Sequence, residues 1–164
     1  MIILYLERNE ILVQLNRFSK EVLIPKKMYL NSAEYDLYAN ETVKVFAGSR
    51  SLVSLDLRMV IPKGYFGRIS PRSGFALNHG IIAFSGTGDS GYTGIIYVLL
   101  FNFSANDFLV EKGNRIAQII FQKCEEVSFV EVETVDIFSE TDFEHLKKEK
   151  SILRGVSYFG SSGL

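Results

Sequence analysis

The chain has 164 residues, of which 47% are hydrophobic, which is enough for one compact domain with a core but leaves little room for two. Eighteen Lys and Arg against nineteen Asp and Glu give a formal net charge of −1. Because proteins that bind nucleic acid usually carry a basic excess, this balance argues against a nucleic-acid partner.

The apolar residues 1–6 are followed at once by charged residues, before a signal-peptide core or a membrane span could be completed. Cys124 is the only cysteine, so no internal disulfide can form, and this suits a reducing compartment. We therefore expect a soluble intracellular protein, in the cytoplasm or nucleus, without a membrane partner. Cys124 itself is interpreted as a small buried residue near a strand end.

Strand patterns dominate the chain. Alternating hydrophobic and polar residues predict a half-buried strand over residues 53–59, and a Pro-Lys-Gly turn at 62–64 leads into a second strand over 65–69. The apolar run 95–103 predicts a central strand buried on both faces, and residues 116–121 and 127–135 repeat the strand pattern. Many short strands separated by turns predict an all-β sandwich or barrel of the jelly-roll kind.

One segment departs from this pattern. Residues 141–144 (Thr-Asp-Phe-Glu) have the spacing of a capping box, and lysines follow toward the end of the turn, so we expect a short exposed helix over 141–150. His79 and His145 lack Cys, His or carboxylate partners at ligand spacing, so the sequence predicts no metal cage built on them.

The first segment with groups that could bind a ligand comprises residues 71–76 (Pro-Arg-Ser-Gly-Phe-Ala). Arg72 offers a planar fork of donors that matches phosphate oxygens, Ser73 a hydroxyl, and Gly74 an unobstructed backbone N–H. A helical turn opening at residues 75–78 would add further donors. The same tripeptide also makes an ordinary turn, so both interpretations stay open for it alone.

A second segment, residues 86–94, places Asp89 among four glycines. The glycines allow the backbone to approach a planar ligand closely, and the ring of Tyr92 can lie against a sugar. A single carboxylate beside a bound polyphosphate is what a water-activating base requires. The alternative is a structural hairpin.

The last residues add Arg154, a second possible phosphate ligand, and the ring of Phe159, on a segment whose glycines permit closure over a ligand. The competing interpretation is a terminus without function.

Taken together, these segments resemble the five motifs of the homotrimeric-type dUTPase family, which occur in one fixed order. Their counterparts here are residues 35–37, 71–76, 86–94, 113–118 and 154–163. The resemblance implies a distorted jelly-roll domain, residues 1–153, with one short helix, and a flexible C-terminal arm, residues 154–164, that closes over the active site. It also implies a homotrimer in which each site draws residues from all three chains.

The resemblance further implies a dUTP diphosphatase that splits dUTP into dUMP and pyrophosphate, limits uracil incorporation into DNA and supplies dUMP for dTTP synthesis. Asp89 would activate the water that attacks the α-phosphorus, with Asp36 in a supporting role. The hairpin that begins at Gly86 would read uracil through backbone groups, and Tyr92 would pack beneath the deoxyribose. The implied ligands of the phosphates and the base are Arg72, Ser73, Gly74, Gln118, Arg154, Phe159, Gly160, Ser161 and Ser162. Mg²⁺ would be held by the triphosphate and water, with no direct protein ligand.

Some positions differ from the usual family pattern. Glu34 stands where glycine is common, Gly88 where an apolar residue precedes the aspartate, and Asn114 where aspartate is common. In the last motif, Ser157 and Tyr158 replace paired glycines.

Two alternatives to the pyrophosphatase are open. One is a dUTPase-derived binding or regulatory protein with weakened catalysis, which the clustered differences favour. The other is a relative of the dCTP deaminases, which is disfavoured because residues 95–100 offer no carboxylate to serve as a base in the strand after the third motif.

Overall fold

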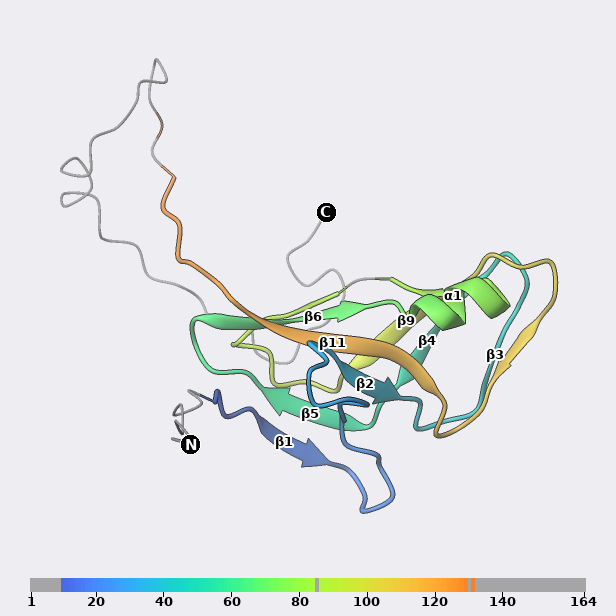
Figure 1. Cartoon of the computed structure of the whole chain (residues 1–164), viewed down its shortest axis with the longest axis horizontal. Helices are drawn as coiled ribbons and strands as arrows, with labels where there is room; N and C mark the ends of the chain where they lie inside the picture. Colours follow the sequence, from blue (N-terminus) through green and yellow to red (C-terminus); the bar gives the residue numbers. More distant parts are fainter. Residues whose placement is uncertain (1–9, 85, 130, 132–164) are drawn as a thin grey trace, which may run out of the picture.

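The structure is a computed structural model that describes residues 10–84, 86–129 and 131. In these residues eleven short strands and one helix, α1 (Ser73–His79), surround a shared apolar core (Figure 1). All the strand pairs are antiparallel. The all-β jelly-roll class predicted from the strand pattern is confirmed.

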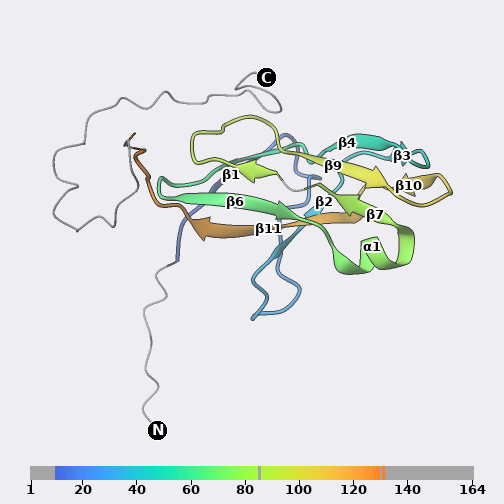
Figure 2. The same ribbon diagram turned by 90° about the horizontal axis from the view of Figure 1, so that it is seen from above.

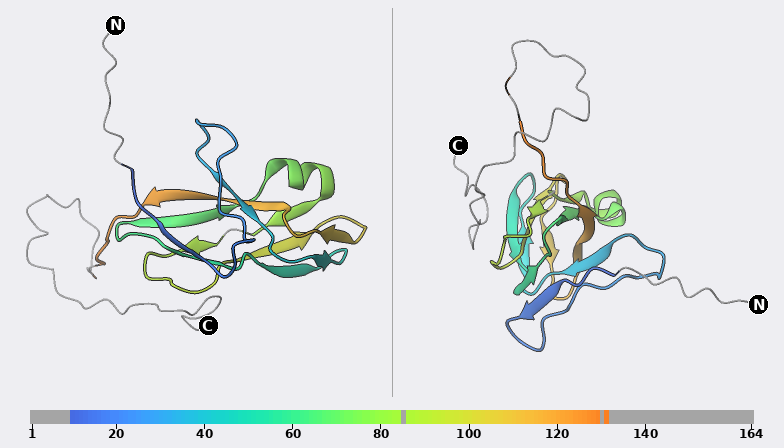
Figure 3. Two further views of the ribbon diagram at one scale, coloured as in Figure 1. Left: turned by 90° about the horizontal axis from the view of Figure 1, so that it is seen from below. Right: turned by 90° about the vertical axis from the view of Figure 1, so that its left-hand side faces the viewer.

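The strands form two larger sheets and two strand pairs. One sheet has the order β2 (Tyr35–Tyr38), β11 (Arg115–Lys123), β6 (Tyr65–Ser70) and β8 (Thr87–Gly88), and the other has the order β4 (Arg50–Ser54), β9 (Tyr97–Asn102) and β7 (Ile81–Ala83). The pairs are β1 (Gln14–Arg17) with β5 (Leu57–Val60), and β3 (Val43–Val45) with β10 (Phe108–Val110). Figures 2 and 3 show the two sheets as facing layers, and their inward side chains form the core.

The strand expected over residues 53–59 is two strands joined by a corner. Its backbone turns at Asp56, which has a φ of +48° and is the only non-glycine residue with positive φ in the described chain. Aspartate tolerates this conformation better than most residues, and here its carboxylate accepts hydrogen bonds from Asn40 Nδ2 at 2.6 Å and from the Ser54 hydroxyl. The predicted alternation nevertheless continues through the corner, with buried Val53, Leu55, Leu57 and Met59.

Two other strand predictions are confirmed, and a third needs correction. The Pro-Lys-Gly turn leads into β6, with Gly64 at a φ of +82°, and β11 contains residues 116–121. The run 95–103 contains β9, which lies in the centre of its sheet, but its residues alternate between buried and half-buried. Only one face of β9 is therefore fully covered, because the other faces outward from the sandwich.

The chain after β11 does not continue as predicted. Residues 127–129 are not in a strand, and Val127 and Phe129 are 69% and 96% exposed, because the chain has left the sheet that would pair with it. Cys124 is exposed rather than buried, although its N–H still donates to the Gly64 carbonyl at 2.9 Å, at the end of the sheet. The rest of the expected strand apart from residue 131, the helix over 141–150, the boundary at 153 and the arm over 154–164 lie outside the described residues.

In the part of the chain that the structure describes, no helix is both long enough and apolar enough to cross a membrane.

Candidate active site

A row of polar side chains crosses the larger sheet. In the strand register Gln118 of β11 stands opposite Asp36 of β2 on one side and opposite Ser70 of β6 on the other. Directly opposed residues of antiparallel strands share a face, so these three side chains lie on one side of the sheet. The next row, Tyr35, Ile119 and Ile69, lies on the other side. The alternation therefore separates a polar row from the core.

Asp36 is the centre of this row. It is 1% exposed, and its carboxylate lies between two arginines: Arg72 Nε is 3.3 Å from Oδ1, and Arg115 Nη1 donates to Oδ2 at 3.2 Å. The first contact is an ion pair without good hydrogen-bond alignment, so Oδ1 has no hydrogen bond among the described residues. Arg72 is fixed at a second point, since its Nη1 donates to the Arg115 carbonyl at 3.0 Å. The buried carboxylate of Asp36 therefore contacts both guanidinium groups at once.

Arg115 lies in the segment 113–118, but the sequence analysis assigned it no role. A β-bulge between Arg115 and Ala117 shifts the register, so that Arg115 stands opposite Tyr38, on the same face as Asp36. Without the extra residue it would face the opposite side of the sheet. The consecutive buried pair Ile116 and Ala117 follows from this bulge, and no alternation in the sequence signals it.

The two guanidinium groups also line an open pocket of about 500 Å³, together with Tyr38, Asn114 and His79. Two arginines share one carboxylate here, and none of the residues that line this pocket is acidic. The local excess of positive charge favours an anion.

The segment 71–76 carries the chain from β6 into α1, as its sequence predicted. Arg72 is the N-cap residue, with extended backbone angles, and Ser73 and Gly74 begin the helix, both exposed. A Cβ added at Gly74, or at Gly86 in the next segment, would meet no described atom within 4 Å, and neither residue has a positive φ. Packing within the chain therefore does not demand glycine at either position, and both leave the backbone open to a ligand.

Asp89 lies at the other end of β6. It follows β8 and opens a turn in which the Tyr92 N–H donates to the Asp89 carbonyl at 3.0 Å. Tyr92 is 5% exposed, and its hydroxyl donates to the Ile95 carbonyl at 2.5 Å, which fixes the orientation of the ring. Asp89 is partly exposed, and it lines a small pocket together with Tyr92.

Within one chain, the strand register separates the residues around Asp89 from the residues around Arg72. Gly88 pairs with Gly67 and Thr87 with Arg68, so β8 runs away from Ser70 and Asp89 lies further still. Ser70 is three positions after Gly67 along β6, a distance of about 10 Å, and α1 begins beyond the far end of β6 (Figure 2). The structure thus brings together Arg72, Ser73, Gly74 and Gln118 with Asp36, and brings together Gly86, Asp89 and Tyr92, but it does not join the two groups.

Three of the positions that differ from the usual family pattern lie in the described residues, and their surroundings can be described. Glu34 accepts a hydrogen bond from the Ser70 hydroxyl at 3.1 Å, which ties the start of β2 to the end of β6. The side-chain oxygen of Asn114 accepts from the Glu111 N–H at 3.1 Å, as an aspartate oxygen would. A Cβ at Gly88 would lie 3.5 Å from the Gly67 carbonyl oxygen, which is ordinary contact, and Gly88 lines a small pocket of about 20 Å³ together with Asp89.

The residues of the arm, Arg154, Phe159, Gly160, Ser161 and Ser162, lie outside the described residues, as do Ser157 and Tyr158. Within residues 10–84, 86–129 and 131, no group of three or more His, Cys, Asp or Glu side chains could hold a metal ion. Asp36 faces two guanidinium groups, so its carboxylate is already neutralised by cations.

Comparison with known proteins gives consistent matches. The dUTPase family model matches residues 20–152. The deoxyuridine 5'-triphosphate nucleotidohydrolase of Fowlpox virus is 41% identical over 152 residues, which cover 93% of this chain and 97% of the relative. The protein of that name from Saccharomyces cerevisiae is 37% identical over 145 residues, covering 88% of this chain and 90% of the relative.

Solved structures are similar in fold. The dUTPase from phage phi11 of S. aureus superposes with a TM-score of 0.73 over 77% of this chain and 99% of its own, at 20% identity. A variant of the same phage enzyme, which coordinates a structural Mg(II) ion, superposes with a TM-score of 0.71 over 75% of this chain and 97% of its own, also at 20% identity.

Proposed function

This chain belongs to the dUTPase family, and we propose that its site hydrolyses dUTP to dUMP and pyrophosphate. The observation that supports this most strongly is the buried carboxylate of Asp36, which holds Arg72 at the edge of an open, glycine-containing surface. A guanidinium with a fixed orientation, next to an unobstructed backbone and a hydroxyl, is suited to a polyphosphate chain.

Arg72 keeps donors free for the substrate. A guanidinium carries five N–H groups, and here Nε faces Asp36 while one Nη1 hydrogen is donated to the Arg115 carbonyl. The remaining N–H groups can bind phosphate oxygens, with the hydroxyl of Ser73, the backbone N–H of Gly74 and the amide of Gln118 beside them. Mg²⁺ held by the triphosphate and water would neutralise part of the phosphate charge when bound.

Asp89 is the proposed general base. Its carboxylate takes a proton from a water molecule as the water oxygen forms a bond to the α-phosphorus. The bond between the α-phosphorus and the bridging oxygen breaks, and pyrophosphate leaves with that oxygen. The backbone from Gly86 reads uracil, and the ring of Tyr92, fixed by the Ile95 carbonyl, supports the deoxyribose and excludes a 2′-hydroxyl.

We infer that two chains are needed to join the phosphate ligands to the base. The register separates Asp89 from Ser73 by more than the length of three strand residues within one chain, so the Asp89 of one subunit would meet the Arg72 of another. A homotrimer with three equivalent shared sites meets this need, and each arm, from Arg154 through Phe159 to Ser162, would close over a site as a lid.

Mixing two inactive variants tests the shared site. Chains with Asp89→Asn and chains that end at Leu153 should each lack activity, and their mixture should recover part of it, because one site can then hold an intact base and an intact arm. A mixture no more active than its components, from chains shown to exchange subunits, would contradict a shared site. Sedimentation at micromolar concentration should show the trimer.

A substrate comparison tests the function itself. Pyrophosphate release should be seen with dUTP and be far lower with dTTP, dCTP and UTP, whereas a deaminase would release ammonia from dCTP. A protein that binds dUTP without releasing pyrophosphate would instead match the alternative of a binding protein with weakened catalysis.

A further inference from the structure

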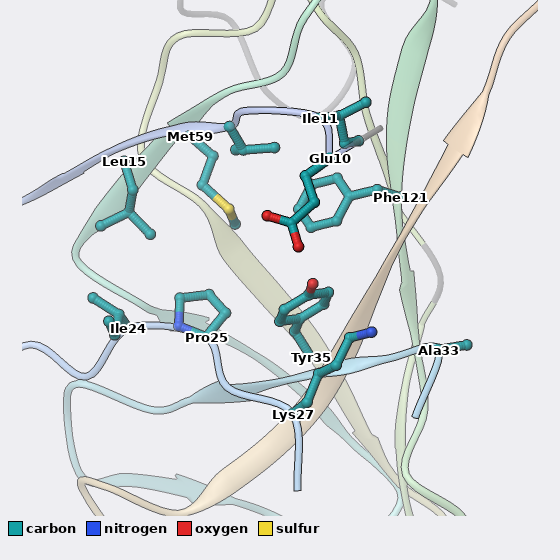
Figure 4. Close-up of a pocket in the computed structure, with 11 residues that line it drawn as sticks. Glu10, Ile11, Leu15, Ile24, Pro25, Lys27, Ala33, Tyr35, Met59 and Phe121 are labelled. Atoms are coloured by element: carbon teal, nitrogen blue, oxygen red, sulfur yellow. The ribbon is translucent and has the colours of Figure 1, made fainter. Parts of the chain in front are cut away.

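Two pockets of the described chain differ in charge. The pocket of about 650 Å³ shown in Figure 4 is lined by one acidic and one basic residue, Glu10 and Lys27, on opposite sides. The pocket of about 500 Å³ beside Asp36 is lined by Arg72 and Arg115 and by no acidic side chain. Both arginines face the same buried carboxylate. One arginine would be enough to neutralise Asp36, so the second requires a further explanation.

The two arginines divide the carboxylate between them. Arg115 Nη1 donates to Oδ2 of Asp36 at 3.2 Å, whereas Arg72 approaches Oδ1 with Nε, at 3.3 Å and without a well-aligned hydrogen bond. Arginine and carboxylate frequently form two parallel hydrogen bonds, one to each oxygen. Arg72 does not make this double contact, and Oδ2 is bound by Arg115 instead. Within the described residues, Nη2 of Arg72 donates no hydrogen bond.

The backbone of Arg115 also holds Arg72. Arg72 Nη1 donates to the Arg115 carbonyl at 3.0 Å, so a single residue contacts both the guanidinium of Arg72 and the carboxylate of Asp36. The β-bulge between Arg115 and Ala117 makes this possible, because it turns the Arg115 side chain to the face of the sheet on which Asp36 lies. With Nε and Nη1 of Arg72 held in this way, its Nη2 group is left for another acceptor.

We propose that Arg115 is a positioning residue: by occupying Oδ2 of Asp36 it prevents Arg72 from binding both carboxylate oxygens, and Nη2 of Arg72 stays available for a phosphate of dUTP. This inference rests on the proposed function, because it concerns the same phosphate site. Asp36 is buried, and a buried charged oxygen without a donor is costly. If the Arg115 guanidinium is removed, Arg72 is the cation that remains beside the carboxylate, and its fork of donors can turn onto both oxygens.

Steady-state pyrophosphate release measures this competition. Arg115→Met keeps a long side chain without a donor, and the KM for dUTP should rise about tenfold, the low end of what a hydrogen bond to a charged group contributes. Turnover should change little, because binding is lost equally in the ground and transition states. Arg115→Lys restores a charged donor and should recover most of the affinity, with Arg115→Gln, a neutral donor, between the two. The matched control, Arg58→Met, removes an exposed arginine that lies over the Phe18 ring and should leave KM unchanged.

A double substitution separates positioning from direct contact with the substrate. In an Asp36→Asn background no carboxylate is left to compete for, so adding Arg115→Met should raise KM by less than about twofold beyond Asp36→Asn alone, a clear departure from additivity. If Arg115 bound the phosphates itself, the two increases in KM would multiply. Increases that multiply, or an unchanged KM in the single variant Arg115→Met, would overturn the proposal.

A crystal structure of Arg115→Met provides a measurement that does not depend on turnover. It should show Nε and Nη2 of Arg72 within hydrogen-bond distance of the two oxygens of Asp36, and an Arg72 side chain in its present position would overturn the proposal. Arg115→Gln serves for the same measurements if the methionine variant does not fold. If the unsubstituted chain releases no pyrophosphate from dUTP, the proposed function fails, and the crystal structure still decides the arrangement around Asp36.

Discussion

Replacing Asp36 by Asn removes one buried charge while keeping the size of the side chain. The carboxylate is 1% exposed and faces Arg72 and Arg115, whose side chains are 24% and 36% exposed. Breaking a fully buried ion pair costs about 3 to 5 kcal/mol, but both arginines reach solvent, so the expected loss of unfolding free energy is about 2 to 3 kcal/mol. For a domain of this size, that lowers Tm by about 4 to 12 °C.

The same substitution should weaken catalysis, because Arg72 loses its charged partner and is held less firmly, although its bond to the Arg115 carbonyl remains. We expect the KM for dUTP to rise by about tenfold, the equivalent of 1.4 kcal/mol. Thermal unfolding at one fixed protein concentration and steady-state pyrophosphate release measure the two effects, since oligomer stability depends on concentration. The control is Glu21→Gln, which removes an exposed ion pair with Lys112. If Asp36→Asn is as stable as this control and its KM is unchanged, Asp36 does not position Arg72.

Three further predictions follow from single residues. Asp89→Asn should lower turnover by about 10² to 10⁴ with little change in dUTP affinity, because an amide cannot accept the proton of water, and near-normal turnover would exclude Asp89 as the base. Asn102→Ala should lower the free energy of unfolding, measured in urea, by about 2 to 4 kcal/mol without changing activity per folded molecule. The reason is that the side-chain amide of Asn102 is fully buried and its Nδ2 donates a hydrogen bond to the Val45 carbonyl. An unchanged urea midpoint would contradict this prediction. The Ala47 N–H, and then Lys44, lower the pKa of Asp107 below its ordinary 3.8, so its stabilisation is complete above that value and lost as pH falls through the lowered pKa. The difference in Tm between the unsubstituted chain and Asp107→Ala should therefore shrink at acidic pH. A difference that grows at acidic pH would contradict a lowered pKa for Asp107.

The sequence alone was sufficient to predict the features that residues close together in the chain determine. The alternation through residues 53–59, the turn before β6 and the helical turn after Arg72 all depend on side chains within a few positions of each other. The same is true of the segments that identify the family, because each motif is a short run of residues. The corner at Asp56 keeps the alternation of buried and exposed side chains, although no sequence pattern predicted where the strand would bend.

Only the tertiary structure decided how these segments meet. Asp36, Arg72 and Arg115 come from β2, the start of α1 and β11, and the bulge in β11 that turns Arg115 toward the carboxylate follows from pairing with another strand. Pairing also explains why residues 127–129 stay exposed, since an apolar run forms a strand only where a neighbouring strand accepts its hydrogen bonds. The register of β6 and β8 separates Asp89 from Arg72, because antiparallel pairing fixes distances between residues that are remote in sequence.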